Sequence, residues 1–484
     1  MVERPWSGDY ETDAGCINFT GMILPVKSEY EKEKRTIMKY TIRFINAIII
    51  FITANLYSIT RLYPIPNTCI WLIILLFIAI NIYPSFEDRK LMTLKLRKCA
   101  RGCECLKLFL FSTVLSVIYS ILGWTGMLGL PAVTEAIRFW LLNSLFVFVA
   151  EALVFWNGII RIYLNSSQLG IKWRIIGALC GMIPIVHLFV LFQLIRIASA
   201  EVAVENDRII RNQARKPDAV CCTRYPILLV HGVFFRDYRF FQYWGRIPKE
   251  LEENGATIYY GNQPSAASVE ESAKYLDSRI RQIVAETHCG KVNIIAHSKG
   301  GLDCRYALSA LGTDEFVASL TTINTPHRGC EFADYLLTKI PESQKNMLAE
   351  TYNRTLRKVG DPDPNFLEAV TALTYQACKK RNEEIMDSPS VYYQSIGSRL
   401  SVATSGRFPL NMTYHAVRLF DGSNDGLVGE QSFPWGESYR FIQSSAKRGI
   451  SHADVIDMNR ENFDGFDVRE FYVDLVHGLK ERGF

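Results

Sequence analysis

Hydrophobic residues follow two different patterns along the chain, and the pattern changes near residue 215. Before that point they form long stretches with hardly any polar face, such as Ile70–Ile80 and Leu141–Val149. A soluble helix keeps a polar stripe, whereas a helix that crosses a bilayer needs about 20 largely apolar residues. We therefore expect an all-α transmembrane region of about five helices. The expected spans are Phe44–Thr60, Asn67–Tyr83, Leu106–Trp124, Phe139–Ile160 and Ile175–Ile195.

After residue 215, short apolar runs alternate with charged amphipathic stretches such as Val269–Ala285. Runs of this length are typical of buried strands, and their alternation with helices favours a mostly parallel, doubly wound sheet with helices on both faces. The second part therefore belongs to the α/β class. The expected strands are Ile227–Val230, Thr257–Tyr260, Val292–Ala296, Leu320–Asn324, Val391–Ile396 and Ala416–Phe420.

These patterns divide the chain into four parts. Residues 1–43 form a polar tail and residues 44–197 the transmembrane region. Residues 198–223 form a polar connector that we expect to be helical at its start. Residues 224–484 form a catalytic α/β domain, because about 260 residues are enough for one large core. A long insertion at about residues 331–389 separates two of its expected strands.

The distribution of charged residues predicts how the transmembrane region is oriented in the membrane. The chain has 484 residues, of which 49% are apolar, and a formal net charge of +5 whose positive excess lies entirely before residue 216. Basic residues that flank apolar spans mark the cytoplasmic side, and nothing in the chain resembles a nucleic-acid-binding patch. We expect a multi-pass protein of the plasma membrane with a cytoplasmic N-terminus. Five spans then place the catalytic domain outside the cell, whereas the failure of one weak span to cross places it in the cytoplasm.

Polar residues inside the spans are candidates for contacts between helices. Glu151 lies within the fourth expected span, and an ionisable group at that depth raises the question of a function. No cation in a neighbouring span is an evident partner for it, so we expect a structural role. Asn143, Asn157 and His187 are candidates for hydrogen bonds between helices. Pro184 is expected to kink the last span.

The segment from Val292 to Gly301 contains the motif Ala-His-Ser-Lys-Gly between an expected strand and an expected helix. A serine at such a tight turn occupies a strained backbone conformation that lifts its hydroxyl clear of the sheet. Side chains two positions away on either side would collide, so Ala296 and Gly300 must be small. This arrangement predicts that Ser298 is a nucleophile.

A serine hydroxyl needs a histidine to take its proton, and in this type of site the order along the chain is serine, acid, histidine. The loop Asp421–Val428 supplies the acid, with Asp425 preferred and Asp421 as the alternative. Two histidines follow that loop. His477 lies in an expected helix, whereas His452 lies in a loop, where a catalytic histidine can turn between nucleophile and leaving group. The expected triad is therefore Ser298, Asp425 and His452.

The oxyanion hole needs two backbone amides. The amide of Lys299 follows the serine directly. The second amide is expected after the first strand, which runs into His-Gly at Gly232. Val233 is our candidate donor and Phe234 the alternative, because glycine at position 232 lets the backbone approach the substrate closely.

With these motifs, most of residues 225–484 resembles the secreted bacterial triacylglycerol lipases of the Pseudomonas and Burkholderia type, which have the α/β-hydrolase fold. The matching stretches are Leu229–Gly232, Ala296–Leu302, Arg305–Tyr306, Thr321–Gly329, Glu331–Asp334, Asn424–Val428 and His452–Asp454. The resemblance implies the triad and oxyanion residues named above, with a mobile lid after Asp334. The transmembrane region is a departure, because those lipases are secreted without it.

The residues that would bind a calcium ion are a second departure from the resembled lipases. In those lipases the ion steadies the histidine loop through a carboxylate two residues after the histidine, a place that Asp454 occupies here. The second carboxylate that the resemblance implies, upstream of the acid, is missing, because residues 388–420 contain no Asp or Glu. Calcium needs six to eight oxygen ligands. We therefore expect no cofactor, and expect Asp454 to pair with a nearby base or to cap the following helix.

The expected function is that of a membrane-anchored serine lipase or carboxylesterase that acts on acyl esters of lipids. In the insertion, Phe332, Leu336, Leu337 and Ile340 are spaced like one apolar face of a helix. Such a helix could cover the serine and lie on lipid when open, so the bilayer and a lipid ester are the expected partners. Two alternatives remain open: a serine acyltransferase, and a non-catalytic membrane receptor or scaffold with a hydrolase-like domain.

Overall fold

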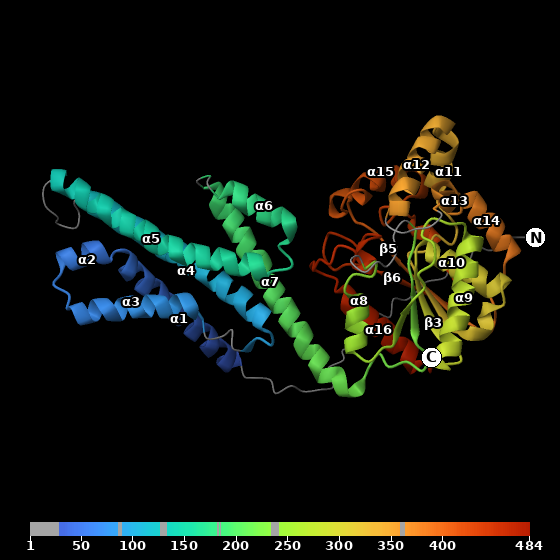
Figure 1. Cartoon of the computed structure of the whole chain (residues 1–484), viewed down its shortest axis with the longest axis horizontal. Helices are drawn as coiled ribbons and strands as arrows, with labels where there is room; N and C mark the ends of the chain where they lie inside the picture. The colour runs from blue at the N-terminus through green and yellow to red at the C-terminus, as the bar shows by residue number, and fades with distance from the viewer. Residues whose placement is uncertain are drawn as a thin grey trace, which may run out of the picture. The chain divides into compact units, whose positions relative to one another are not determined.

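A computed structural model of the chain describes residues 29–484 apart from residues 86–89, 126–132, 182, 184, 234–241 and 359–363. The chain divides into two compact units between Val202 and Ala203, a point inside one long helix. The first unit is helical and the second contains the sheet (Figure 1). The expected class, an α-helical region followed by an α/β domain, is confirmed.

The first unit is built from helices throughout its described residues. Their bounds are α1 Glu29–Ala54, α2 Leu56–Leu62, α3 Asn67–Ile82, α4 Leu94–Trp124, α5 Val133–Asn165, α6 Gly170–Cys180 and α7 Val186–Arg215, whose last residues belong to the second unit. Four segments are long and apolar enough to cross a membrane: Thr36–Ala54, Leu94–Trp124, Ile137–Asn165 and Val186–Asp218. Most side chains within their most apolar stretches are not buried inside the protein, as expected of helices that face lipid.

The expected spans and the observed helices differ at two places. The expected span Phe44–Thr60 is divided, because α1 ends at Ala54 and α2 begins at Leu56. The expected span Ile175–Ile195 is also divided, between the end of α6 and the start of α7. Proline lacks an amide hydrogen and collides with the preceding helical turn, which fits this break, although Pro184 itself lies outside the described residues.

Polar side chains inside the first unit bond to one another between helices. Asn143 of α5 donates to Asn55 Oδ1 at 2.9 Å, and Asn55 donates to Ser116 Oγ of α4 at 3.0 Å. Glu151 of α5 accepts a hydrogen bond from Ser112 of α4 at 2.9 Å. These contacts join neighbouring helices, as polar side chains do within membranes.

The second unit contains a six-stranded sheet in the order β2-β1-β3-β4-β5-β6, and every neighbouring pair is parallel. The strands are β1 Ile227–Val230, β2 Ile258–Tyr260, β3 Val292–His297, β4 Val317–Ile323, β5 Tyr392–Ser398 and β6 Ser438–Ile442. The first, third and fourth of them are buried along their whole length. Parallel strands that are covered on both faces are buried continuously in this way.

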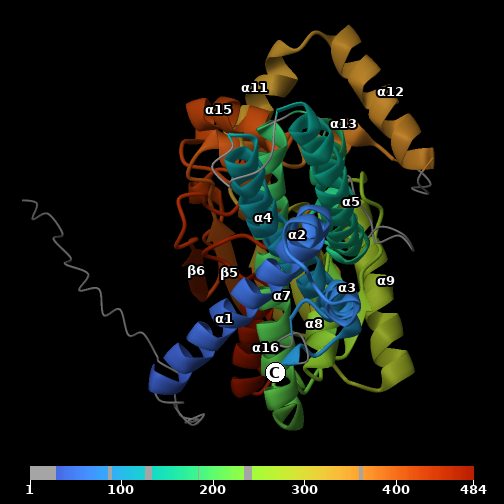
Figure 2. The ribbon, with the colours of Figure 1, turned by 90° about the vertical axis from the view of Figure 1, so that its left-hand side faces the viewer.

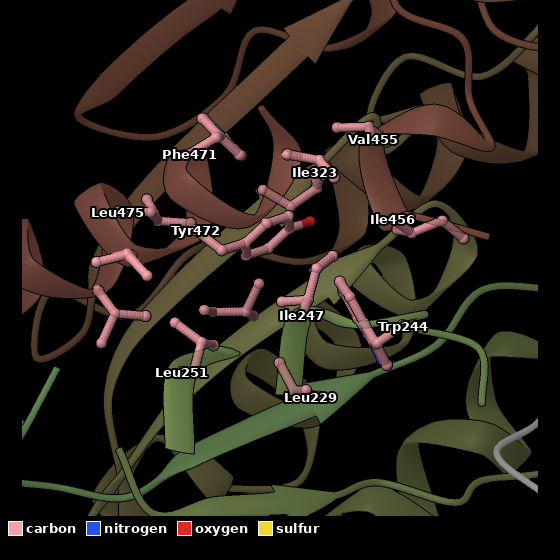
Figure 3. Close-up of a cluster of buried hydrophobic side chains, with 14 of the residues drawn as sticks. Leu229, Trp244, Ile247, Leu251, Ile323, Val455, Ile456, Phe471, Tyr472 and Leu475 are labelled. Carbon is pink, nitrogen blue, oxygen red and sulfur yellow. The ribbon is translucent and has the colours of Figure 1, made fainter. Parts of the chain in front are cut away.

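Helices cover both faces of the sheet. Ile227 and Leu229 of β1 pack with α8 (Ile247–Glu253) and α16 (Val468–Glu481), whereas Leu228 and Val230 face α9 (Val269–Thr287) and α10 (Lys299–Ala310). Figure 1 shows the two helix pairs on opposite sides of the strands. The core on the α8 and α16 side is drawn in Figure 3, where Val455 and Ile456, just after the histidine loop, lie among its side chains.

The expected strand Ala416–Phe420 is wrong. These residues lie in helix α15 (Leu410–Asp421). The buried residues of that helix, Leu410, Tyr414 and Val417, have helical spacing, which a five-residue apolar window cannot show. The sheet is instead completed by β6, whose residues are mostly half-buried or exposed, so that it lacks the apolar run of a central strand.

The insertion between β4 and β5 is helical where it is described. It contains α11 Glu331–Lys339, α12 Glu342–Lys358, α13 Phe366–Thr371 and α14 Tyr375–Glu384. Helix α11 packs against α15, where the ring of Tyr335 lies 4.6 Å from that of Phe420. Figure 2 shows α12 projecting from the body of the unit beside α11.

Candidate active site

Ser298 occupies the turn between β3 and α10. Its backbone angles are φ 55° and ψ −131°, a combination that costs free energy for any residue with a side chain. The turn is tight because a Cβ atom placed on Gly300 would lie 2.4 Å from the carbonyl oxygen of His231. Ala296, on the other side of the serine, is fully buried. The small residues at both positions therefore make this conformation of Ser298 possible.

Asp425 and His452 are joined by a hydrogen bond of 2.6 Å between Oδ2 and Nδ1. Asp425 is fully buried, and its other oxygen, Oδ1, accepts the amides of Leu427 at 3.0 Å and Val428 at 2.9 Å. His452 remains 8% exposed. The carboxylate is thus held by its own loop and orients the histidine ring.

The ring of His452 lies beside the turn that contains Ser298. The ring centroids of His452 and His297, the residue just before Ser298, are 4.4 Å apart. Burial, and then the proximity of His452, hold the pKa of His297 well below its usual range, so this neighbour is neutral at pH 7. His452 therefore contacts an uncharged ring on one side, and its acidic partner is Asp425.

Asp421 and His477, the other acid and histidine considered from the sequence, make different contacts. Asp421 is the last residue of α15, and its carboxylate accepts the amides of Glu331 at 2.9 Å and Phe332 at 3.1 Å. It therefore caps the N-terminus of α11. His477 lies in α16 within 3.4 Å of Glu481. The hydrogen-bond and ion-pair partners described for both side chains are residues other than His452.

The two expected oxyanion amides flank the serine turn. Lys299 is the first residue of α10, where backbone amides have no partner within the helix. Gly232 approaches closely, since a Cβ atom on it would lie 2.8 Å from Ser298 Cβ. Val233, the next residue, is half-buried, and Phe234 lies outside the described residues.

Two residues that the sequence prediction missed support these loops. The hydroxyl oxygen of Tyr243 accepts the Gly232 amide at 3.0 Å and lies 2.7 Å from Nδ1 of His297. Asn324 follows β4 with φ 45° and donates to Asp425 Oδ2 at 2.7 Å. Asparagine tolerates the left-handed region better than most residues, which is the one signal that could have marked Asn324.

Asp454 is paired with a base. Both of its oxygens lie near Nη2 of Arg448, at 2.7 and 2.9 Å, and Oδ2 also accepts the amide of Ser451 at 3.1 Å. In the part of the chain that the structure describes, no three His, Cys, Asp or Glu side chains are grouped as metal ligands. A guanidinium at this place repels a cation, so the residues present do not fit the calcium ion that the resemblance implies.

Comparison with known proteins gives several similar lipases. The chain is 30% identical over 263 residues to triacylglycerol lipase 2 of Saccharomyces cerevisiae, a match that covers 50% of this chain and 74% of the yeast protein. It is 29% identical over 296 residues to a triacylglycerol lipase of Pseudomonas fragi, covering 54% of this chain and 98% of that lipase.

Among solved structures, the Staphylococcus hyicus lipase superposes with a TM-score of 0.42 at 17% identity. This superposition covers 54% of this chain and 97% of that one. No protein-family model matches the chain.

Proposed function

Because the chain belongs to the triacylglycerol lipase family of the α/β-hydrolase superfamily, we propose that it is a membrane-anchored serine lipase. It cleaves acyl ester bonds of lipids through an acyl-enzyme on Ser298. The observation that carries this proposal is the 2.6 Å hydrogen bond between Asp425 and His452, beside the strained turn of Ser298. The four apolar helices are the proposed membrane anchor.

The first half of the reaction forms the acyl-enzyme. His452 takes the proton of the Ser298 hydroxyl while Oγ attacks the ester carbonyl carbon. Asp425, fully buried beside Nδ1 of His452, stabilises the imidazolium that results. The amides of Lys299 and Val233 donate to the oxyanion. Collapse of the intermediate breaks the ester bond, and His452 gives its proton to the departing alcohol.

The second half releases the fatty acid. Water replaces the alcohol, loses a proton to His452 and attacks the acyl carbonyl. The bond to Ser298 Oγ breaks, the serine recovers the proton, and the carboxylic acid leaves. An alcohol in place of water would give a new ester by the same steps, so acyl transfer is an outcome of the test below.

The proposed substrate is a long-chain, water-insoluble ester. Helix α11 contains three of the four residues expected to form an apolar face, whereas Ile340 lies just beyond its end in extended conformation. Phe332, Leu336 and Leu337 are half-buried, and Thr338 and Lys339 are exposed. An amphipathic helix of this kind in an insertion beside the site favours contact with a lipid surface. A membrane anchor makes lipid the most concentrated neighbour of the site.

The test compares hydrolysis of a long-chain triacylglycerol emulsion with hydrolysis of p-nitrophenyl butyrate by the purified full chain in detergent. We expect a higher specific activity on the emulsion, and a rise in rate when the substrate concentration passes its solubility limit. A preference for butyryl esters with no gain at an interface would contradict the lipase proposal and indicate a carboxylesterase. Predominant transfer of the acyl group to an added alcohol would indicate an acyltransferase.

A further inference from the structure

The last residues of α7 belong to the catalytic unit, which begins at Ala203. They carry a row of charged and polar side chains that bond to residues of α8, of α16 and of the loop before α16. These residues are Glu205, Arg208, Arg211, Asn212 and Arg215. Most of the row faces α8 and α16, on the outer side of the core. Glu205 differs from the others because one of its partners, Arg246, bonds to the chain segment that follows His452.

Glu205 is surrounded by cations. Its Oε1 accepts from Arg469 at 2.8 Å and from Asn462 at 3.0 Å, and its Oε2 accepts from Arg208 at 3.1 Å. Arg246 Nη1 lies 3.7 Å from Oε1. The guanidinium groups of Arg469, Arg208 and Arg246 therefore lie around this one carboxylate.

Arg246 connects Glu205 to the histidine side of the site. Its backbone amide, Nε and Nη2 donate to the carboxylate of Asp457 at 2.8, 2.7 and 2.7 Å. Its Nη1 also donates to Asn462 at 2.8 Å. Asp457 lies five residues after His452, and its side chain is 1% exposed. The carboxylate of Asp457 is thus held by three hydrogen bonds from Arg246.

The same arginine is close to the oxyanion side. It lies three residues after Tyr243, whose hydroxyl oxygen accepts the amide of Gly232. Between them, Gly245 has φ 53°, and a Cβ atom on it would lie 2.1 Å from the carbonyl oxygen of Asp457. The backbone next to Tyr243, whose hydroxyl oxygen accepts the Gly232 amide, is therefore in close contact with the backbone of Asp457, and Glu205 lies 3.7 Å from the arginine that bonds to Asp457.

We propose that Glu205 is a positioning residue for catalysis: through Arg246 and Asp457 it holds the oxyanion segment and the histidine loop in register with Ser298. The inference rests on the proposed function of this site. It makes the end of α7, a helix that begins in the membrane unit, a part of the catalytic machinery. Loss of the carboxylate removes the two hydrogen bonds that Arg469 donates to it and the 3.7 Å ion pair of Arg246. The buried Arg469 then lacks its main partner, and we expect Arg246 and the segments it contacts to shift.

The test uses Glu205→Gln in the full chain, since glutamine keeps the shape of the side chain and removes its charge. Arg211→Ala is the matched control, because Arg211 is on the same helix but 47% exposed, with ion pairs of 3.4 and 3.5 Å to Asp467 and Glu470. Active sites are counted by titration with a fluorophosphonate. Then kcat per titrated site and KM are measured on a soluble p-nitrophenyl ester.

We expect Glu205→Gln to lower kcat per titrated site at least about tenfold with KM within about twofold, as for loss of an interaction that acts on the transition state. Asp457→Asn should show the same division between kcat and KM, and Arg211→Ala should match the wild type. Unchanged turnover per titrated site in Glu205→Gln, even with fewer sites or a lower melting temperature, would overturn the inference. A wild-type chain without esterase activity would contradict the proposed function instead.

Discussion

Asp425 and Asp421 are four residues apart, and their surroundings give them different tasks. Asp425 Oδ2 faces His452, and its Oδ1 is fixed by two amides of its own loop. Asp421 caps α11, and burial raises its pKa, an effect that the two amides oppose and the nearby acids Glu331 and Asp334 reinforce. One carboxylate therefore acts on the histidine, and the other holds the start of the insertion.

We expect Asp425→Asn to lower kcat by about 10³–10⁴, because an amide neither fixes the histidine tautomer nor stabilises the imidazolium. Asp421→Asn should keep most of the activity on a soluble ester, since an asparagine oxygen still caps a helix. Initial rates of the two purified variants on p-nitrophenyl butyrate make the comparison. A greater loss in Asp421→Asn than in Asp425→Asn would show that the acid is assigned to the wrong residue.

The residues of the triad could be predicted because chemistry fixes their order and local sequence. Ser298 needs small neighbours, and only two histidines follow the acid loop. Tyr243 and Asn324 could not be predicted in the same way. Their roles depend on hydrogen bonds between segments that are distant in sequence, and no local motif encodes such contacts.

At the scale of elements, the sequence predicted five of the six strands, the edge strand β2 among them, and missed β6. β1, β3 and β4 are buried along their whole length, and the apolar runs Ile227–Val230 of β1 and Ile294–Ala296 of β3 stand out in the sequence. β6 is partly exposed and lacks this pattern, whereas the apolar end of α15 imitates a strand. Propensity over five residues is a weak guide where tertiary contacts decide the conformation.

An ion pair between Arg448 and Asp454 holds the histidine loop. Arg448 Nη2 bonds to both oxygens of Asp454, its Nε donates to the carbonyl of Ser405 at 3.3 Å, and its guanidinium lies 4.1 Å from the ring centroid of Phe463. Asp454 is buried, with 2% of its side chain exposed. The arginine thus ties the loop to two neighbouring segments.

We therefore expect a calcium chelator to leave both activity and the melting temperature unchanged. Arg448→Ala should lower the free energy of unfolding by roughly 3–5 kcal/mol, because it leaves the buried carboxylate of Asp454 without its partner. Arg407→Ala is the control, since Arg407 is exposed in its ion pair with Glu461 and contributes about 0–1 kcal/mol. Thermal denaturation with and without chelator measures each effect, and a chelator-sensitive wild type would contradict the ion-pair account.

For the whole molecule, the separation into a helical unit and an α/β unit could be predicted, because one needs lipid-facing surfaces and the other a soluble core. The number of membrane-spanning helices could not be predicted from the sequence. The expectation of an extracellular catalytic domain rests on five crossings, whereas four described segments are long enough and α3 is a shorter apolar helix. The side of the membrane on which the catalytic unit lies therefore stays a prediction.

The proposed mechanism depends on an acyl-enzyme formed on Ser298. The direct measurement is labelling of the purified full chain with a fluorophosphonate, followed by mass spectrometry of the modified peptide and by assay of the remaining hydrolysis. We predict one adduct, on Ser298, and loss of activity in proportion to labelling. Ser298→Ala should show neither labelling nor hydrolysis, with a loss of roughly 10⁴–10⁶ in rate. An adduct on another residue, or hydrolysis that persists in Ser298→Ala, would contradict the account.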